Sequence, residues 1–129
     1  MNDRLSKGIR SDELQPTFDV IDKLKGTTLY NYNQHWVEVE QEDGKKAKKN
    51  EYNSLRVDYP VNANTVFGTL LTAVYPENEE QKLLNDYNAA IAGIEPEEKK
   101  QPYLDFLNAR KSFRAMVDAD CTTNNIPLK

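Results

Sequence analysis

A period of two in the side chains between residues 28 and 59 predicts β-strands. In the first half of this region, one face carries Thr28, Tyr30 and Tyr32. In the next part, His35, Val37 and Val39 alternate with Trp36, Glu38 and Glu40. In the last part, Leu55, Val57 and Tyr59 alternate with Ser54, Arg56 and Asp58. Such alternation is typical of half-buried antiparallel strands, and Pro60 is expected to end the ladder.

The segment between these strands is polar and predicts a hairpin connection. Residues 41–50 contain Asp43-Gly44 and four lysines, so we expect a loop longer than the tight two-residue type. If the hairpin closes around residues 44–48, Val37 lies opposite Leu55 on the core face, and Trp36 lies opposite or diagonal to Arg56.

The N-terminal quarter of the chain gives a weaker pattern. The first ten residues are polar and without periodicity, which indicates a mobile arm. Ser11 is a possible N-cap, and Phe18, Ile21 and Leu24 have a spacing that fits a short helix ending near Gly26. The stretch 17–21 could also form a strand.

From residue 62 onward the period becomes helical. Asn62 or Asn64 can cap a first helix, and Pro76 followed by acidic residues opens a second one that ends before Gly93. A third helix is expected from about Pro102, with a continuous apolar face and with Cys121 on its core-facing side.

Together these patterns predict one α+β domain over residues 1–129. It consists of a small antiparallel sheet of two or three strands, at about residues 27–60, followed by a bundle of two or three helices at about residues 62–121. Residues 1–10 and 122–129 are expected to be flexible.

The composition adds limits on compartment and partners. The chain is 38% apolar and 29% charged, with a net charge of -4, so there is no overall attraction to phosphates. Cys121 is the single cysteine, the N-terminus is polar, and the apolar-leaning stretch 66–74 is far shorter than a membrane span. We therefore expect a cytoplasmic protein with no membrane segment.

Candidate chemistry is sparse. The five glycines stand at positions 8, 26, 44, 68 and 93, too far apart for a phosphate-binding loop. One histidine and one cysteine do not suffice for a structural zinc site. His35 could be a catalytic base with Cys121, but a lone histidine is more often structural or solvent-facing. We predict no catalytic, cofactor or metal site, and an enzyme would need an unrecognised site made of Tyr, Asp, Glu, Arg or His35.

Two surface features remain as binding hypotheses. The first is an aromatic cluster on the outer face of the predicted sheet, a composition that is enriched in protein interfaces and also suits base stacking. Its members are Tyr30, Tyr32, Trp36, Tyr52 and Arg56. The alternative is that a helix covers this face and the aromatic residues belong to the core.

The second feature is basic and offers a disfavoured nucleic-acid hypothesis. It comprises Lys45, Lys46, Lys48 and Lys49 in the hairpin loop, and separately Arg110, Lys111 and Arg114 on the last helix. Lysines at a hairpin tip more often form a solvated turn, and the arginines could pair with acidic neighbours or cover apolar surface with their alkyl stems.

Residues 51–76 (EYNSLRVDYPVNANTVFGTLLTAVYP) run from a strand into a capped helix pair. This stretch resembles small uncharacterised accessory proteins encoded by phages and prophages. The resemblance implies a virion-associated or assembly role carried by surfaces, and it assigns no functional residue. We therefore expect a non-enzymatic interaction or structural module that self-associates, as a homo-oligomer, or docks on a larger assembly, with no small-molecule ligand.

Overall fold

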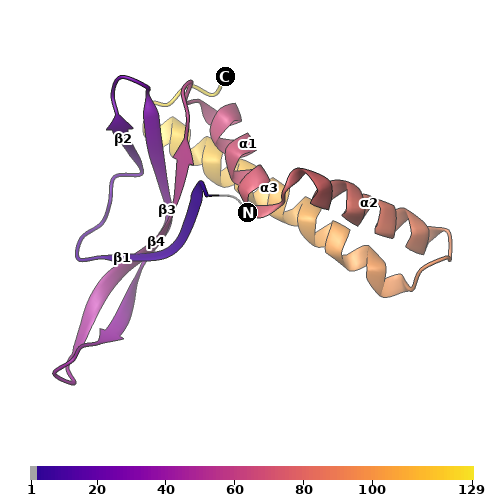
Figure 1. The fold of residues 1–129 in the computed structure, drawn as a ribbon, viewed down its shortest axis with the longest axis horizontal. Coiled ribbons are helices and arrows are strands. Elements are labelled where there is room, and N and C mark those ends of the chain that lie inside the picture. Colours follow the sequence, from indigo (N-terminus) through magenta and orange to yellow (C-terminus); the bar gives the residue numbers. More distant parts are fainter. Residues whose placement is uncertain (1–2) are drawn as a thin grey trace.

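The computed structural model describes residues 3–129 and shows an α+β fold. Four antiparallel strands form one sheet in the order β1-β4-β3-β2. Their bounds are β1 Leu5–Ser11, β2 Phe18–Asp22, β3 Thr27–Glu40 and β4 Lys46–Val57. The predicted sheet of two or three strands is therefore wrong, because residues before Thr27 supply both edge strands. Figure 1 shows the sheet on one side of the molecule and the helices on the other.

The two missed strands have different causes. β1, which the sequence analysis assigns to a mobile arm, contains only Leu5 and Ile9 as large apolar residues, and it is held by backbone pairing with β4. β2 takes the place of the helix proposed for residues 11–26 and agrees with the strand alternative for 17–21. Neither edge strand needs an alternating apolar face, because pairing with a neighbouring strand satisfies its backbone. Residues 1 and 2 of the predicted arm lie outside the described residues.

The hairpin of β3 and β4 closes earlier than predicted. Its turn spans residues 41–45, and Gly44 has the positive φ of +80° that this turn requires. Val37 therefore lies opposite Lys49 rather than Leu55, and Leu55 lies opposite Tyr30. Most of the lysine run belongs to β4 and not to a loop.

The observed helices agree closely with those predicted from the sequence. α1 (Ala63–Val74) begins after Asn62, whose side chain accepts a hydrogen bond from the Thr65 N–H in a capping box. α2 (Glu77–Ile91) begins after Pro76, and a 3₁₀ turn, η1 (Glu97–Lys100), leads into α3 (Gln101–Thr123). No helix in residues 3–129 is long and apolar enough to cross a membrane.

Two separate apolar clusters hold these elements together. The larger one lies between the sheet and helices α1 and α3, and its buried members are Tyr30, Tyr32, Leu55, Val57, Ala63, Val66, Phe67, Leu70, Val117 and Cys121. The smaller one joins α2 to α3 where they extend away from the sheet (Figure 1). Phe106 is buried there and contacts the rings of Tyr75 and Tyr103. The sheet therefore has an inner side, which faces α1 and α3, and an outer side.

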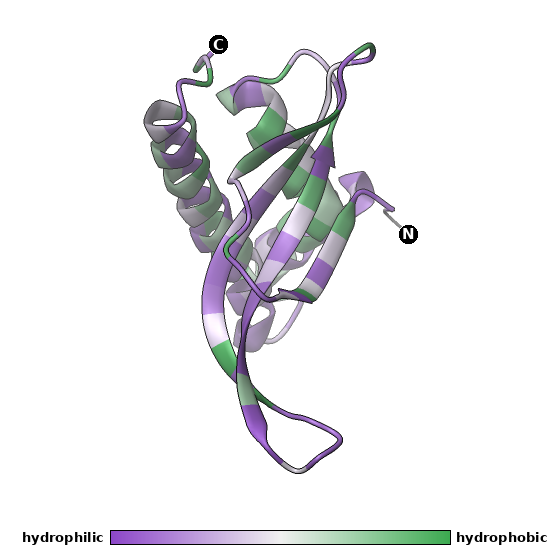
Figure 2. Cartoon of the chain, turned by 90° about the vertical axis from the view of Figure 1, so that its left-hand side faces the viewer, coloured by the Kyte–Doolittle hydropathy of each residue, from purple (hydrophilic) through white to green (hydrophobic). Residues whose placement is uncertain are grey.

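Part of the outer side of the sheet is covered by the β1–β2 connection, residues 12–17, which we call the strap. The Asn31 side chain donates to the Pro16 carbonyl at 2.8 Å, and Gln34 exchanges two hydrogen bonds with the backbone of Gln15. Asn50 is fully buried and donates to the Gln34 side chain at 2.9 Å. Figure 2 looks at this side of the molecule, with the strap crossing the strands.

Candidate functional site

The half of the β3–β4 hairpin that contains the turn, residues 35–51, projects beyond the helices and the edge strands (Figure 1). We call it the projecting hairpin. β2 pairs only with residues 27–30 of β3, and β1 pairs only with residues 50–55 of β4. Most of the projecting hairpin is therefore a two-stranded ribbon without a neighbouring strand. Such ribbons are marginally stable by themselves in water.

The outer side of the projecting hairpin combines an aromatic residue with charges of both signs. Trp36 lies opposite Asn50 and is 51% exposed. Next along the ribbon, Glu38 lies opposite Lys48, and then Glu40 lies opposite Lys46. An exposed tryptophan in such a setting is typical of a binding surface.

The predicted aromatic cluster is divided between the two sides of the sheet. Tyr30 and Tyr32 are buried on the inner side, whereas Trp36, Tyr52 and Arg56 lie on the outer side. Trp36 is separated from the two tyrosines by a β-bulge in β3, where Asn33 and Gln34 together lie opposite the single residue Tyr52 of β4. Tyr52 and Arg56 are on the outer side because Leu55, which alternates with them, pairs with Tyr30. One extra residue in a strand moves every later side chain to the opposite face. The even-numbered residues therefore cease to share a face after Tyr32.

Tyr30 has a structural role at the centre of the core. Its ring stacks between Phe18 and Tyr32, with centroids 5.0 and 5.2 Å away. Its hydroxyl donates to Asp120 Oδ2 of α3 at 2.5 Å. Burial, and secondly this hydrogen bond to a carboxylate, raise the pKa of Tyr30 far above its ordinary value. The hydroxyl therefore stays protonated and ties the sheet to α3.

The predicted basic residues do not gather on one surface. Lys46 and Lys48 lie on the outer side of β4, while Lys49 lies on the inner side and forms an ion pair with Asp12. Lys45 ends the turn. The four lysines thus point to different sides and stand beside acidic residues, an arrangement that offers phosphates no continuous basic track.

Two of the basic residues of α3 also contact neighbouring side chains. The guanidinium groups of Arg110 and Arg114 each lie 5.2 Å from the centroid of the Phe67 ring. Arg114 also forms an ion pair with Asp118 at 3.2 Å. Lys111 is exposed. The two arginines therefore cover the flank of the core, as their alternative interpretation from the sequence anticipates.

His35 and Cys121 are not neighbours in a catalytic pair. His35 Nδ1 lies 2.8 Å from the Asn33 carbonyl, and its Nε2 lies 3.1 Å from Glu51 Oε2, both on the exposed hairpin. Cys121 is fully buried in the core, and burial, followed by the nearby Asp118 and Asp120, raises the pKa of its thiol to about 11. A protonated, buried thiol is a poor nucleophile.

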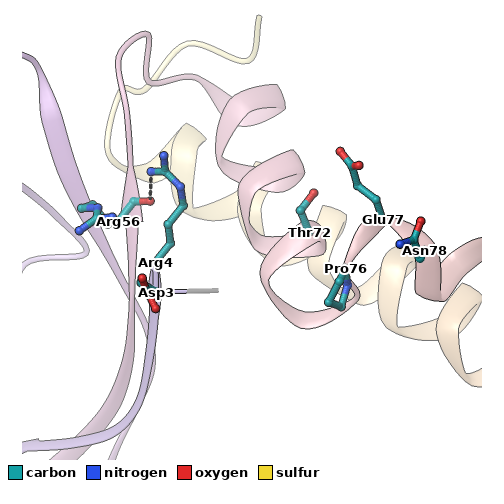
Figure 3. Close-up of a pocket in the computed structure, with 7 residues that line it drawn as sticks. All are labelled: Asp3, Arg4, Arg56, Thr72, Pro76, Glu77 and Asn78. Carbon is teal, nitrogen blue, oxygen red and sulfur yellow. Dashed lines mark hydrogen bonds between the residues drawn. The ribbon is translucent and has the colours of Figure 1, made fainter. Parts of the chain in front are cut away.

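A groove with both polar and apolar lining runs between residues 3–4 and helix α1. One part of it, of about 470 Å³, lies among Arg4, Thr72, Pro76 and Glu77 (Figure 3). The next part, of about 530 Å³, continues along α1. The Arg4 guanidinium donates to Asp58 at 2.6 Å and to the Arg56 carbonyl, and this contact lowers the pKa of Asp58. The Arg4–Asp58 pair thus links the residue before β1 to the residue after β4, which favours a structural role for these two side chains.

A more apolar cavity lies on the inner side of the sheet, where the strands bend. Its volume is about 400 Å³, and its apolar wall consists of Tyr32, Val74, Phe113 and Met116. Lys7, Asn33, Asn53 and Ser112 supply its polar atoms. We call it the bend cavity. Sequence reasoning missed it, and its only local signals are Gly8 and Asn33, whose residue types tolerate a positive φ.

No group of three or more His, Cys, Asp or Glu side chains within residues 3–129 is arranged to hold a metal ion. The candidate sites are therefore the projecting hairpin and the bend cavity. Comparison with known proteins found no matching family model, no matching curated protein and no matching solved structure.

Proposed function

We propose that this protein is a non-enzymatic interaction module that self-associates or docks on a larger assembly. The observation that carries the proposal is the projecting hairpin with its half-exposed Trp36. A two-stranded ribbon without a second layer gains little from its own side chains, so contact with a partner would stabilise it.

The environment of Trp36 favours a protein partner over a nucleic acid. The aromatic residues that stacking on several bases would need are divided between the two sides of the sheet, and the nearby lysines stand opposite glutamates. Tryptophan beside mixed charges is typical of the centre of a protein interface with a polar rim. The resemblance of residues 51–76 to phage accessory proteins is the reason to include a virion among the assemblies considered.

The test is the mass of the protein in solution, measured by light scattering after size exclusion at low and high salt. We expect the wild-type chain to exceed the monomer mass of 14.8 kDa at both salt concentrations, because an interface centred on an aromatic residue is weakly screened. Trp36→Ala should return the protein to a monomer with an unchanged circular dichroism spectrum.

Leu24→Ala is the matched control. Leu24 is fully exposed in the turn between β2 and β3, at the opposite end of the sheet from the projecting hairpin. Removing it tests whether loss of any exposed apolar side chain lowers the mass. An assembly that Trp36→Ala leaves intact, or one that dissolves only at high salt and releases nucleic acid, would contradict the proposal.

A further inference from the structure

Two irregularities meet at one level of the sheet and create the bend cavity. In β1, Lys7 and Gly8 together lie opposite one residue of β4, and in β3 the same holds for Asn33 and Gln34, so each strand has one extra residue. Both lie beside the same short stretch of the central strand β4. Gly8 and Asn33 have positive φ values of +66° and +56°. Bulges bend strands and often lie next to binding sites.

Asn53 of β4 connects the two irregular strands. Its Oδ1 accepts a hydrogen bond from the Gly8 N–H at 3.1 Å, and its side chain lies near the Tyr32 hydroxyl. The bend is therefore fixed by a side chain that itself lines the bend cavity. A cavity bounded by a fixed backbone is largely preformed, as binding pockets usually are.

The chemistry of the bend cavity suits a flat aromatic group with a carboxylate beside it. Tyr32 and Phe113 offer ring surfaces, and Met116 offers a polarisable thioether that contacts aromatic rings favourably. Lys7 also lines the cavity, and its long side chain brings a positive charge within reach of the opening. The volume of about 400 Å³ lies in the lower part of the range for small-molecule pockets, which is enough for one large side chain.

The chain itself presents such a group. Trp36 and Glu38 lie on the same side of β3, two residues apart, which corresponds to roughly 7 Å along a strand. Both lie on the outer side of the sheet, whereas the bend cavity is on the inner side. A chain therefore cannot fill its own cavity with its own Trp36.

We infer that the bend cavity receives Trp36 of a second copy of this chain, with Glu38 of that copy next to Lys7. The inference rests on the proposed function and names its partner. Complementary charge selects the second copy, because the aromatic residue and the acid match the apolar wall and the cation of the cavity. Every copy carries both the tryptophan and the cavity, so a reciprocal two-fold dimer and a head-to-tail ring both satisfy this contact.

Trp36 is the only tryptophan of the chain, so its fluorescence reports the contact directly. Emission should shift to shorter wavelength as the concentration rises, in parallel with the mass. Trp36→Ala should weaken association more than about thirtyfold, the loss typical of a central interface residue. A chain that stays monomeric with the emission of an exposed tryptophan would overturn this inference and self-association together.

Ser112→Phe tests the cavity without changing the hairpin. Ser112 is exposed at the edge of the bend cavity, so a phenylalanine there should block entry and abolish both the mass increase and the emission shift. Ala115→Phe is the matched control, since Ala115 is exposed on the same helix and does not line the cavity. Association that is lost in Trp36→Ala but retained in Ser112→Phe would overturn the cavity inference and leave the proposed function standing.

Mixing the two variants provides the sharpest test. Trp36→Ala keeps its cavity and Ser112→Phe keeps its tryptophan, so an equimolar mixture should form a pair of twice 14.8 kDa and no larger species. A mixture that stays monomeric would contradict insertion of Trp36 into the cavity of another copy.

A charge exchange tests the orientation of the contact. Lys7→Glu and Glu38→Lys should each weaken association about fivefold, as expected for an exposed ion pair, and the double variant should recover it. No recovery in the double variant would overturn the placement of Glu38 next to Lys7. Native mass spectrometry detects whether a small molecule co-purifies with the chain. A bound small molecule on every chain, together with the lack of a concentration-dependent emission shift, would show that the second copy is not the occupant of the cavity.

Discussion

Strands β3 and β4 each pass through two different surroundings. In the half of the sheet that α1 and α3 cover, the inner-side residues Tyr30, Leu55 and Val57 are almost completely buried. In the projecting hairpin, Val37 and Val39 occupy the same side of the same sheet and remain partly exposed. The alternation of side chains is equally clear in both halves. The alternation therefore predicts a strand, but it does not predict whether a second layer covers that strand.

The difference between the halves arises at the bend. The inserted residues in β1 and β3 redirect the strands, and no helix of the described chain packs over the projecting hairpin. The covered half therefore gains from burial against a second layer, and the projecting half depends mainly on cross-strand pairs, each worth roughly 0.2–1 kcal/mol. This asymmetry suits a protein in which one half folds the chain and the other half binds.

The largest expected difference between the halves is in thiol reactivity. The pKa of Cys121 is raised to about 11, so at pH 8 its thiolate is about a hundredfold scarcer than that of an ordinary thiol. A cysteine introduced by Val39→Cys lies on the projecting hairpin and should react with an aromatic disulfide reagent more than a hundredfold faster than Cys121. Two equally fast thiols would show that the core half opens as readily as the hairpin.

The same pKa gives a direction for alkaline pH. The thiol is protonated in the folded chain and ionises more easily in the unfolded chain, so stability from this group is present at neutral pH and lost as the pH rises toward about 11. Cys121→Ser should remove part of this alkaline dependence.

The parts of the fold that are encoded locally could be predicted from the sequence. The Asn62 cap, the Pro76 start of α2 and the burial of Cys121 are confirmed, because capping and helical periodicity depend on neighbouring residues. β1 could not be predicted, since its seven residues are mostly polar and the residues of β4 that pair with it lie 39 to 50 positions later in the chain. Its stability comes from tertiary contact rather than from propensity.

The candidate site was partly predictable for a related reason. Trp36 belongs to the predicted interface, but Tyr30 and Tyr32 do not share its face, because the bulge at Asn33 reverses the alternation. Asparagine tolerates a positive φ, yet Asn31, Asn50 and Asn53 occupy strand positions of the same sheet without one. The bend cavity depends on two bulges in strands that are not neighbours, which no local pattern records.

Matched valine substitutions measure the difference in packing. Val57 is 1% exposed in the covered half, and Val37 lies on the same side in the projecting hairpin. Val57→Ala should lower the free energy of unfolding by about 2 kcal/mol, which combines lost burial with a cavity, and Val37→Ala by less than about 0.5 kcal/mol. Urea unfolding of monomeric protein, in the Trp36→Ala background, measures both. Equal losses would mean that the hairpin is packed as tightly as the core.

The smallest expected difference is in the free energy of unfolding after loss of a tyrosine hydroxyl. Tyr30 lies inside the covered half, and Tyr32, which stacks on it, lies at the boundary with the bend. Tyr30→Phe removes the hydroxyl that donates to the Asp120 carboxylate and should cost about 1.5 kcal/mol, as for a hydrogen bond to a charged acceptor. Tyr32→Phe removes only a hydroxyl that lies near the neutral Asn53 amide and should cost about 0.5 kcal/mol. Urea unfolding again gives both values. If Tyr32→Phe is the costlier change, the bend contributes more to stability than the contact between the sheet and α3. The tightly packed half of the sheet then extends beyond the bend into the hairpin.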